Sequence, residues 1–253
     1  MSVTLAELMQ YLDGCLQPGQ FQDYCPNGLQ VEGRSGITRL ATGVTASQRL
    51  LDHAIAWEAD AILVHHGYFW KGEDQAIVGI KRKRIAALLK NDVSLLAYHL
   101  PLDAHPQLGN NARLGQLMGL HSHEPLQPGN AGSVGNIASL PEPVAARELV
   151  SRLQEITGRI PLHIGDGDEP VRRVAWCTGA AQGYIEAAVA AGADAFVTGE
   201  ASEQTVHIAR EEGIHFIAAG HHATERYGVQ ALGEHLAQEF TLQHRFIDID
   251  NPV

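Results

Sequence analysis

Histidines and carboxylates occur together in three short segments of this sequence, and each segment follows an apolar run that is typical of a buried strand. The segments are Val64-His65-His66-Gly67, His99-Leu100-Pro101-Leu102-Asp103-Ala104-His105 and Gly220-His221-His222-Ala223-Thr224-Glu225. Imidazole and carboxylate groups without thiolates are the ligands of a catalytic type of site for a borderline or hard metal ion. The sequence therefore predicts a metal site at the ends of strands.

Five side chains in these segments are candidate metal ligands. A catalytic zinc ion typically takes three protein ligands and keeps one position open. Five ligands with two carboxylates suit a pair of divalent ions about 3.5–4 Å apart, which would activate water as hydroxide and polarise the bond attacked. Iron, manganese, zinc and magnesium all remain open, whereas soft copper(I) does not fit. The candidates are His65, His66, Asp103, His221 and Glu225.

The spacing of the candidates limits how they can meet. Adjacent side chains of a regular strand point to opposite faces, so His65 and His66 either face two neighbouring ions or bend round one where the strand ends at Gly67. His221 and Glu225 are four residues apart and can share one side of a helical turn. Asp103 follows Pro101 and is expected in an extended loop.

The alternative for any histidine is an ordinary surface or hydrogen-bonded core role, and this chain has 14 of them. His99, His105 and His222 are intermediate, since they adjoin the candidate ligands and could orient them. For the others that lack a ligand-like setting the ordinary role is expected. These are His53, His121, His123, His163, His207, His235 and His244.

Composition excludes several classes of protein. With 253 residues and 45% hydrophobic residues, the chain resembles ordinary globular proteins and can bury a substantial core. Its apolar stretches are too short to span a bilayer, and Glu7 and Asp13 lie where an export signal would be apolar. Cys15, Cys25 and Cys177 form no C-x-x-C motif, which argues against a disulfide framework and suits a reducing cytoplasm.

The charge balance bears on partners. A formal net charge of −11 should repel duplex DNA and anionic membranes. The one basic run, Lys81-Arg82-Lys83-Arg84, is expected to be the solvated start of a helix, and it also offers a place for a small anionic substrate. Trp70, Lys71 and Arg84 are candidates for contacts with that substrate. Thr178-Gly179-Ala180 lacks the Walker pattern and is at most a weak phosphate-loop candidate.

The two halves of the chain are related. Residues 37–66 align with 171–200, with matches that include Arg39/Arg173 and Asp60/Asp194. In each half a strand, a helix and a second strand are expected: Leu40–Gly43, Ser47–Trp57 and Ala61–Val64 in the first, and Val174–Cys177, Gln182–Ala191 and Ala195–Thr198 in the second. Chance similarity between alanine-rich segments is the alternative.

A second correspondence relates His99-x-x-x-Asp103 to His221-x-x-x-Glu225, with a different offset in residue number. Both follow expected strands, Ser94–Ala97 and His215–Ala218, and both precede expected helices, Arg113–Met118 and Val229–Leu236. This alternation predicts an α/β fold with mainly parallel strands, in which sites lie beyond the carboxyl ends of strands.

The middle of the chain, about 122–170, differs from both halves. Gly129 to Gly135 is rich in loop residues, Pro143–Thr157 has the pattern of a helix, and Pro161–Ile164 that of a strand. A helix is also expected at Leu5–Leu16. We therefore expect two related α/β domains, residues 1–125 with the first three candidate ligands and residues 126–253 with the last two.

With these motifs, the sequence resembles the NIF-three-like family, whose members are often labelled GTP cyclohydrolase I type 2 homologues. It is most similar to the short bacterial members. The resemblance covers nearly the whole chain. It rests on Asn27-Gly28-Leu29-Gln30-Val31, on His65-His66-Gly67, on His99 to His105 with Gly109-Asn110-Asn111, on Thr198-Gly199-Glu200 and on Gly220-His221-x-x-Thr224-Glu225.

The resemblance implies two α/β domains with a dinuclear metal site in the cleft between them, the same five ligands, and assembly into a ring-shaped homohexamer. The label implies metal-assisted attack of water on the imidazole part of guanine in GTP, with Asp103 or Glu225 as a bridge and His99, His105 or Glu200 as proton carriers. Other members are connected with metal delivery, so a metallochaperone or scaffold without turnover is the alternative. A DNA-binding regulator is disfavoured by the charge.

Overall fold

The computed structural model describes residues 2–129 and 133–253, which divide into two compact units. The first unit comprises Met1–Gly109 and Gly228–Asp250, and the second Asn110–Tyr227 and Asn251–Val253. The division differs from the expected 1–125 and 126–253 because a late strand, β13 (Gln243–Phe246), pairs with β4 (Arg39–Thr45) of the first unit. No local sequence pattern shows such a long-range pairing.

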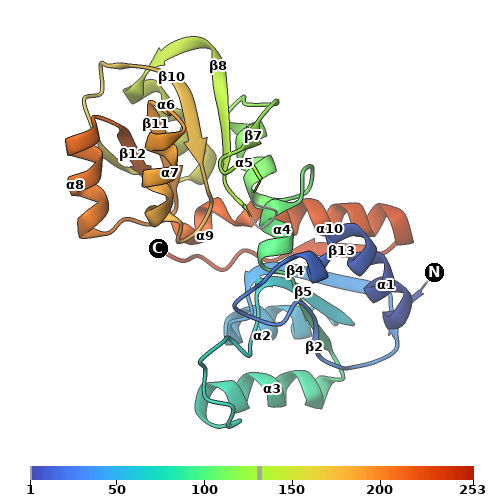
Figure 1. The fold of residues 1–253 in the computed structure, drawn as a ribbon. Helices are drawn as coiled ribbons and strands as arrows, with labels where there is room; N and C mark the ends of the chain where they lie inside the picture. Colours follow the sequence, from blue (N-terminus) through green and yellow to red (C-terminus); the bar gives the residue numbers. More distant parts are fainter. Residues whose placement is uncertain (1, 130–132) are drawn as a thin grey trace. The chain divides into compact units, whose positions relative to one another are not determined.

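The first unit is built on a five-stranded sheet in the order β13-β4-β5-β6-β2, parallel except for the antiparallel β2 (Figure 1). Leu5–Leu16 and Ser94–Ala97 have the predicted bounds. Its other elements are β1 (Val3–Thr4), α1 (Leu5–Leu16), the 3-10 helix η1 (Pro18–Gln20), β2 (Gly28–Val31), β3 (Gly36–Ile37), α2 (Gln48–Ala56), β5 (Ala61–His66), α3 (Gly79–Asn91), β6 (Ser94–Ala97), α4 (Leu100–Ala104) and α10 (Arg226–Phe240) from Gly228 onward.

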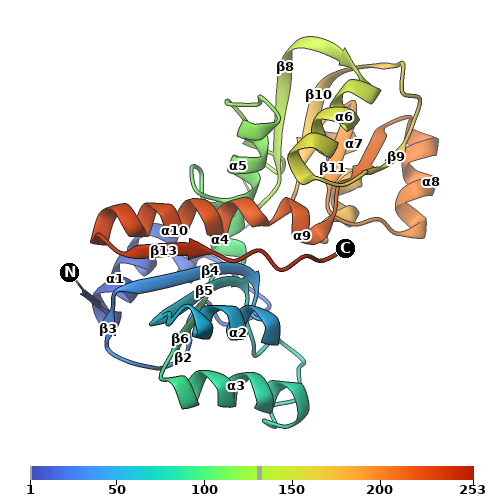
Figure 2. The same ribbon diagram turned by 180° about the vertical axis from the view of Figure 1, so that it is seen from behind.

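Helices cover both faces of this sheet (Figures 1 and 2). Alternate strand residues point to opposite faces, so Leu63 packs with α1 and α10 while its neighbour Ile62 packs with α2 and α3. The local signals for these helices are clear. Thr4 and Glu7 form a capping box at the start of α1, and the Ser47 side chain caps α2. The sheet is thus buried on both faces, which holds the carboxyl ends of its strands in place.

The second unit has a six-stranded sheet in the order β7-β8-β10-β11-β12-β9, of which only β10, β11 and β12 are parallel to one another. The expectation of mainly parallel strands therefore holds only for the centre of this mixed sheet. Its elements are α5 (Asn110–Leu117), β7 (Glu124–Pro125), β8 (Asn136–Ala145), α6 (Ala146–Thr157), β9 (Leu162–Ile164), β10 (Pro170–Trp176), η2 (Gln182–Tyr184), α7 (Ile185–Ala190), β11 (Ala195–Thr198), α8 (Glu203–Glu212), β12 (His215–Ala218) and α9 (His221–Thr224).

The helix expected at Pro143–Thr157 begins later, at Ala146, and Pro143 lies in β8, a strand that the sequence did not reveal. The pairing of β8 with β10 is irregular where Pro141 and Pro143 occur, which is where proline is tolerated in a strand. Of the expected loop Gly129 to Gly135, residues 130–132 lie outside the described part of the chain.

The internal relationship is visible in equivalent hydrogen bonds. Oδ2 of Asp60 accepts from the backbone N–H groups of Thr38 and Arg39, and Oδ2 of Asp194 accepts from those of Arg172 and Arg173. In each unit, an aspartate that directly precedes one strand (β5 or β11) thus binds the backbone of the neighbouring strand (β4 or β10). The two sets of contacts are related by the same offset in residue number as the aligned segments 37–66 and 171–200. The correspondence between the halves is therefore structural. Over the described residues no helix has the length and apolar character needed to cross a membrane.

Candidate metal site

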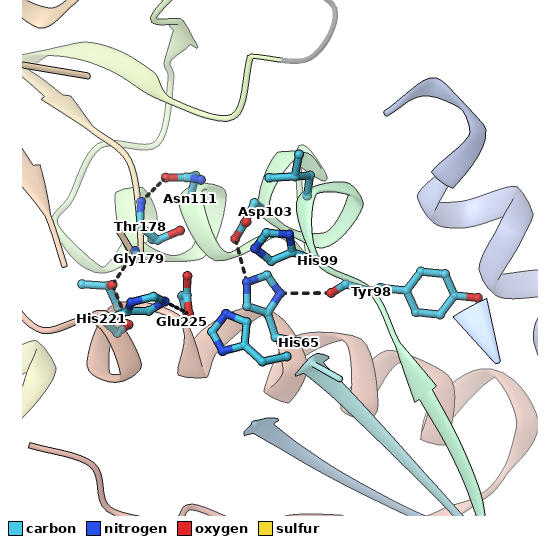
Figure 3. Close-up of polar contacts among 12 residues, drawn as sticks. His65, Tyr98, His99, Asp103, Asn111, Thr178, Gly179, His221 and Glu225 are labelled. Atoms are coloured by element: carbon cyan, nitrogen blue, oxygen red, sulfur yellow. Dashed lines mark hydrogen bonds and ion pairs between the residues drawn. The ribbon is translucent and has the colours of Figure 1, made fainter. Parts of the chain in front are cut away.

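His65 and His66 are the last two residues of β5, at the carboxyl end of the first sheet. His65 is completely buried. Its Nδ1 lies 3.0 Å from the carbonyl oxygen of Tyr98. Because a carbonyl oxygen has no proton to donate, Nδ1 carries the hydrogen of the ring. The lone pair is then on Nε2, which lies 3.5 Å from Oδ1 of Asp103 (Figure 3). One candidate histidine is therefore oriented by the backbone and faces a candidate carboxylate.

His66 is half-buried, and its ring centroid lies 4.6 Å from that of His65. Its Nδ1 is 3.1 Å from Oγ1 of Thr45, at the end of the neighbouring β4. One ring nitrogen from each of His65, His66 and His99 lies within 4.8 Å of the others. Because the strand ends at His66, both neighbouring imidazoles reach the same place.

Asp103 lies in the short helix α4 and not in the extended loop that the sequence suggested. Pro101 is in the first turn of this helix, where its missing N–H removes no hydrogen bond. The Asp103 side chain is buried, and the helix presents it to Nε2 of His65. The preceding proline therefore starts the helix that positions this carboxylate.

An aspartate that sequence reasoning missed orients His99. Oδ1 of Asp23 lies 2.7 Å from Nδ1 of His99, and Oδ2 accepts from Nδ2 of Asn27 and from the N–H of Leu100. Burial by itself raises the pKa of Asp23, but the hydrogen bonds from His99, Asn27 and Leu100 and the charge of His99 outweigh it and lower that pKa to about 2. The ring of Trp70 lies 5.1 Å from that of His99.

We expect Asp23→Asn to destabilise the metal-free protein by about 2 kcal/mol at pH 7. A carboxyl group whose pKa is lowered by folding contributes stability above its unfolded pKa, near 4, and that stability is lost as the pH falls toward the folded value of about 2. Urea unfolding in EDTA between pH 7 and pH 3 measures the free energy of unfolding of both proteins. The difference between wild type and variant should narrow below pH 4, and a constant difference would contradict the assignment.

In the second unit, His221 and Glu225 lie at the two ends of the one-turn helix α9. The four-residue spacing places Nε2 of His221 3.1 Å from Oε2 of Glu225 (Figure 3). Its Nδ1 lies 2.6 Å from Oε1 of Glu200. Burial lowers the pKa of His221, but the hydrogen bonds and charges of Glu225 and Glu200 outweigh this effect and raise that pKa to about 9. A divalent ion would replace this proton, since a ligand histidine must be neutral.

Gly179 shapes the space around these two side chains. It follows β10 with a φ of +72°, and its N–H donates to Oγ1 of Thr224 over 3.1 Å. A Cβ atom at this position would overlap Oε1 of Glu225 and lie 3.3 Å from Nε2 of His221. The preceding Thr178 is held through its N–H by Oδ1 of Asn111. The weak phosphate-loop candidate is thus a glycine turn that leaves room for the Glu225 carboxylate.

The other histidines have ordinary contacts. Nδ1 of His105 accepts from the N–H of Leu108, and its Nε2 lies 3.6 Å from Sγ of Cys15, so it is not grouped with the ligands of the first unit. His235 and His244 are hydrogen-bonded inside the first unit, to the hydroxyls of Tyr11 and Thr42 respectively, as expected for core residues. The backbone N–H of His222 donates to the carbonyl of Val253.

Four histidines share one arrangement. In each, Nδ1 lies within hydrogen-bond distance of a protein oxygen. Where that oxygen is a carbonyl or a carboxylate, as for His65, His99 and His221, the neutral ring carries its hydrogen on Nδ1 and keeps the lone pair on Nε2. This is the orientation that protein oxygens impose on metal-binding histidines. The pairs are His65 with Tyr98, His66 with Thr45, His99 with Asp23, and His221 with Glu200. Of these four partners, Asp23 and Glu200 are carboxylates. The sequence analysis pointed to Glu200 but not to Asp23.

The fold and these side chains define a mixed α/β protein with two sheet-containing regions and clusters of histidine and carboxylate at strand ends. The family model of Duf34/NIF3 (NGG1p interacting factor 3) matches residues 3–252. The chain belongs to this family, which confirms the resemblance found in the sequence. In Pseudomonas aeruginosa a "GTP cyclohydrolase 1 type 2 homolog" is 56% identical over 252 residues, covering 100% of both chains. A Yersinia pestis protein with the same name is 56% identical over 247 residues, 97% of this chain and 98% of its own.

Solved structures agree with the fold. Protein ybgI, of unknown function, is 51% identical and superposes with a TM-score of 0.94 over 99% of this chain and 100% of its own. TTHA1606 from Thermus thermophilus is 35% identical with a TM-score of 0.89 over the same shares. HcgD from Methanocaldococcus jannaschii has a TM-score of 0.84 at 21% identity, covers 99% of both chains, and supports the fold alone.

Proposed function

We propose that His65, His66, Asp103, His221 and Glu225 together hold a pair of divalent metal ions, and that the protein is a metal-dependent hydrolase. The observation that carries the proposal is the shared orientation of the histidines, with Nδ1 on a protein oxygen and Nε2 of His65 and His221 aimed at a carboxylate. Imidazole nitrogens and carboxylate oxygens suit iron, manganese or zinc, while magnesium would favour a larger share of oxygen ligands. Neither unit alone contains all five residues, so both units would contribute ligands to the pair of ions.

When bound, such a pair of ions acidifies a water molecule and polarises the bond that is attacked. The protein's own residues would do the remaining work. Asp23 holds the His99 ring beside His65 and His66, which makes His99 the best-placed proton carrier. Glu200 fixes the ring of His221. Trp70, whose ring lies 5.9 Å from that of His66, offers a flat surface for a heterocycle. Lys71, by contrast, is exposed.

For the substrate we propose a nucleotide, with GTP as the first to test, because the relatives carry the name GTP cyclohydrolase 1 type 2 homolog. The reaction would begin with attack of water on the imidazole part of guanine, followed by ring opening. Three free thiols suit a reducing cytoplasm, where we place the protein. Assembly into a homohexamer is proposed from the resemblance, and light scattering would then give six times the 27.3 kDa chain mass.

The test is turnover of a nucleotide panel by metal-loaded wild type, His99→Ala and Glu225→Ala. We expect metal-dependent release of product from GTP, a rate lowered about 100-fold or more in His99→Ala with metal content unchanged, and no turnover in Glu225→Ala. Bound metal with no turnover of any nucleotide would contradict the hydrolase proposal. It would favour the metal-delivery alternative, which the 25% exposed side chain of His221 would suit by allowing exchange with a chelator.

A further inference from the structure

A cavity of about 480 Å³ lies beside the carboxyl ends of β11 and β12 in the second unit. Its wall includes Gly199 and Glu200 after β11, Ala218 at the end of β12, and the segment from Arg159 to Leu162 that enters β9. In open α/β sheets ligands bind at this edge, beyond the carboxyl ends of parallel strands. The cavity therefore adjoins Glu200, which holds the ring of His221.

Arg159 is the cation of this cavity. It follows Gly158, the left-handed residue that ends α6, and its guanidinium lies against the backbone of Gly220, the residue before His221. A Cβ atom at Gly220 would lie 2.5 Å from Nη1 and 3.0 Å from Cζ of Arg159. The φ of +100° at Gly220 excludes most side chains in any case, so this glycine leaves room for the guanidinium.

The guanidinium lacks an acceptor for one buried donor. Within residues 2–129 and 133–253, the buried Nη1 of Arg159 has no hydrogen-bond partner, and its side chain makes no ion pair. Arginine stays ionised at any physiological pH. Arg159 also lines the cavity, so it is a fixed positive charge beside a ligand bound there. Glu200 lines the same cavity, but its Oε1 faces Nδ1 of His221, and no ion pair joins it to Arg159 within the described residues.

The remaining wall is apolar and unusually exposed. Ile160 is 78% and Leu162 48% exposed, although both are large aliphatic residues. Ile160 follows Arg159 directly, Leu162 comes two residues after Ile160, and both line the same cavity. A cation next to an aliphatic surface matches a small molecule that has one anionic group on an apolar body. The planar fork of a guanidinium matches a phosphate or a carboxylate with two parallel hydrogen bonds.

We propose that this cavity binds the oxyanion group, phosphate or carboxylate, of a small-molecule ligand through Arg159, with the ligand's apolar body against Ile160 and Leu162. The inference rests on the proposed function, since it assigns a binding role to the cavity next to the His221 ligand. It makes Arg159 a binding residue and gives it no role in holding metal.

The test measures binding of phenyl phosphate, benzoate and phenol to the metal-loaded full-length protein by calorimetry. The three probes share a ring and carry a phosphate, a carboxylate or neither. We expect the two anions to bind, with the tighter of them identifying the preferred oxyanion, and phenol to bind more weakly by about tenfold or more. Equal binding of phenol and both anions, or no binding of either anion, would overturn the proposal.

Variants show whether the cavity is responsible. Arg159→Ala should weaken binding of the anions about tenfold or more, whereas Arg172→Ala, at an exposed arginine of the same unit, should leave it unchanged. Ile160→Glu places a negative charge beside Arg159 at a position exposed enough to keep the fold, and should weaken binding similarly, while Ile160→Lys should not. Unchanged anion affinity in both Arg159→Ala and Ile160→Glu would exclude this site.

Metal content of every variant separates the two proposals. Arg159→Ala is expected to hold as much metal as wild type, because Arg159 lies against Gly220 and, within the described residues, makes no hydrogen bond or ion pair with His221 or Glu225. Loss of anion binding with metal retained supports the Arg159 cavity whether or not GTP is turned over. A wild type that binds anions but no metal would defeat the proposed function and leave this inference standing.

Discussion

Purified wild-type protein is expected to carry about two divalent ions per chain, and His66→Ala and Glu225→Ala are each expected to lose one or both. His66 is the last residue of β5 and Glu225 follows α9, so the two variants remove one donor from each unit. Deleting an imidazole or carboxylate ligand leaves an ion with too few donors, and its affinity should fall by about 100-fold or more. Elemental analysis after dialysis against a weak chelator measures the content.

The double variant His66→Ala/Glu225→Ala tests whether the ligands act together. If both units hold the same pair of ions, the double variant should lose no more metal than the worse single variant, because the first substitution already empties the site. Matched controls are His53→Ala on the exposed face of α2 and Glu212→Ala at the exposed end of α8, which should keep full metal content. Losses that simply add would mean two independent sites.

Gly179→Ala is expected to lower metal content about as strongly as loss of a ligand, although Gly179 has no side chain to bind metal. Its φ of +72° costs alanine about 1–2 kcal/mol. The new methyl group would also overlap Oε1 of Glu225, so the carboxylate must turn away from its place beside His221. Metal content and thermal unfolding with and without added zinc or manganese measure the two effects separately.

Gly183→Ala is the matched control. This glycine lies four residues further on, in η2, outside the left-handed region, and no atom of the described residues lies within 4 Å of a Cβ placed there. The substitution should keep metal content and change stability by less than about 1 kcal/mol. If Gly179→Ala held as much metal as Gly183→Ala, Glu225 would not need its present position, and its assignment as a ligand would fail.

The sequence allowed the regular part of the fold to be predicted with accuracy. Ala195–Thr198 and His215–Ala218 have the bounds that their apolar runs predicted, and Leu5–Leu16 has those set by its apolar spacing and its capping residues. These are local signals that a buried strand or an amphipathic helix shows in any context. Strand β8 escaped prediction because two prolines interrupt its pattern, and their tolerance depends on an irregular pairing with β10.

By itself the sequence determined the α/β alternation, the internal repeat and the histidines and carboxylates placed after apolar strands, because each of these is written in consecutive or regularly spaced residues. Only the tertiary structure decided which groups orient them. Asp23 meets His99 from 76 positions away, Tyr98 gives its carbonyl to His65, Gly179 makes room for Glu225, and Arg159 lies on Gly220. Such contacts join segments far apart in the chain, and their geometry follows from the packing of strands and helices that no short segment of sequence specifies.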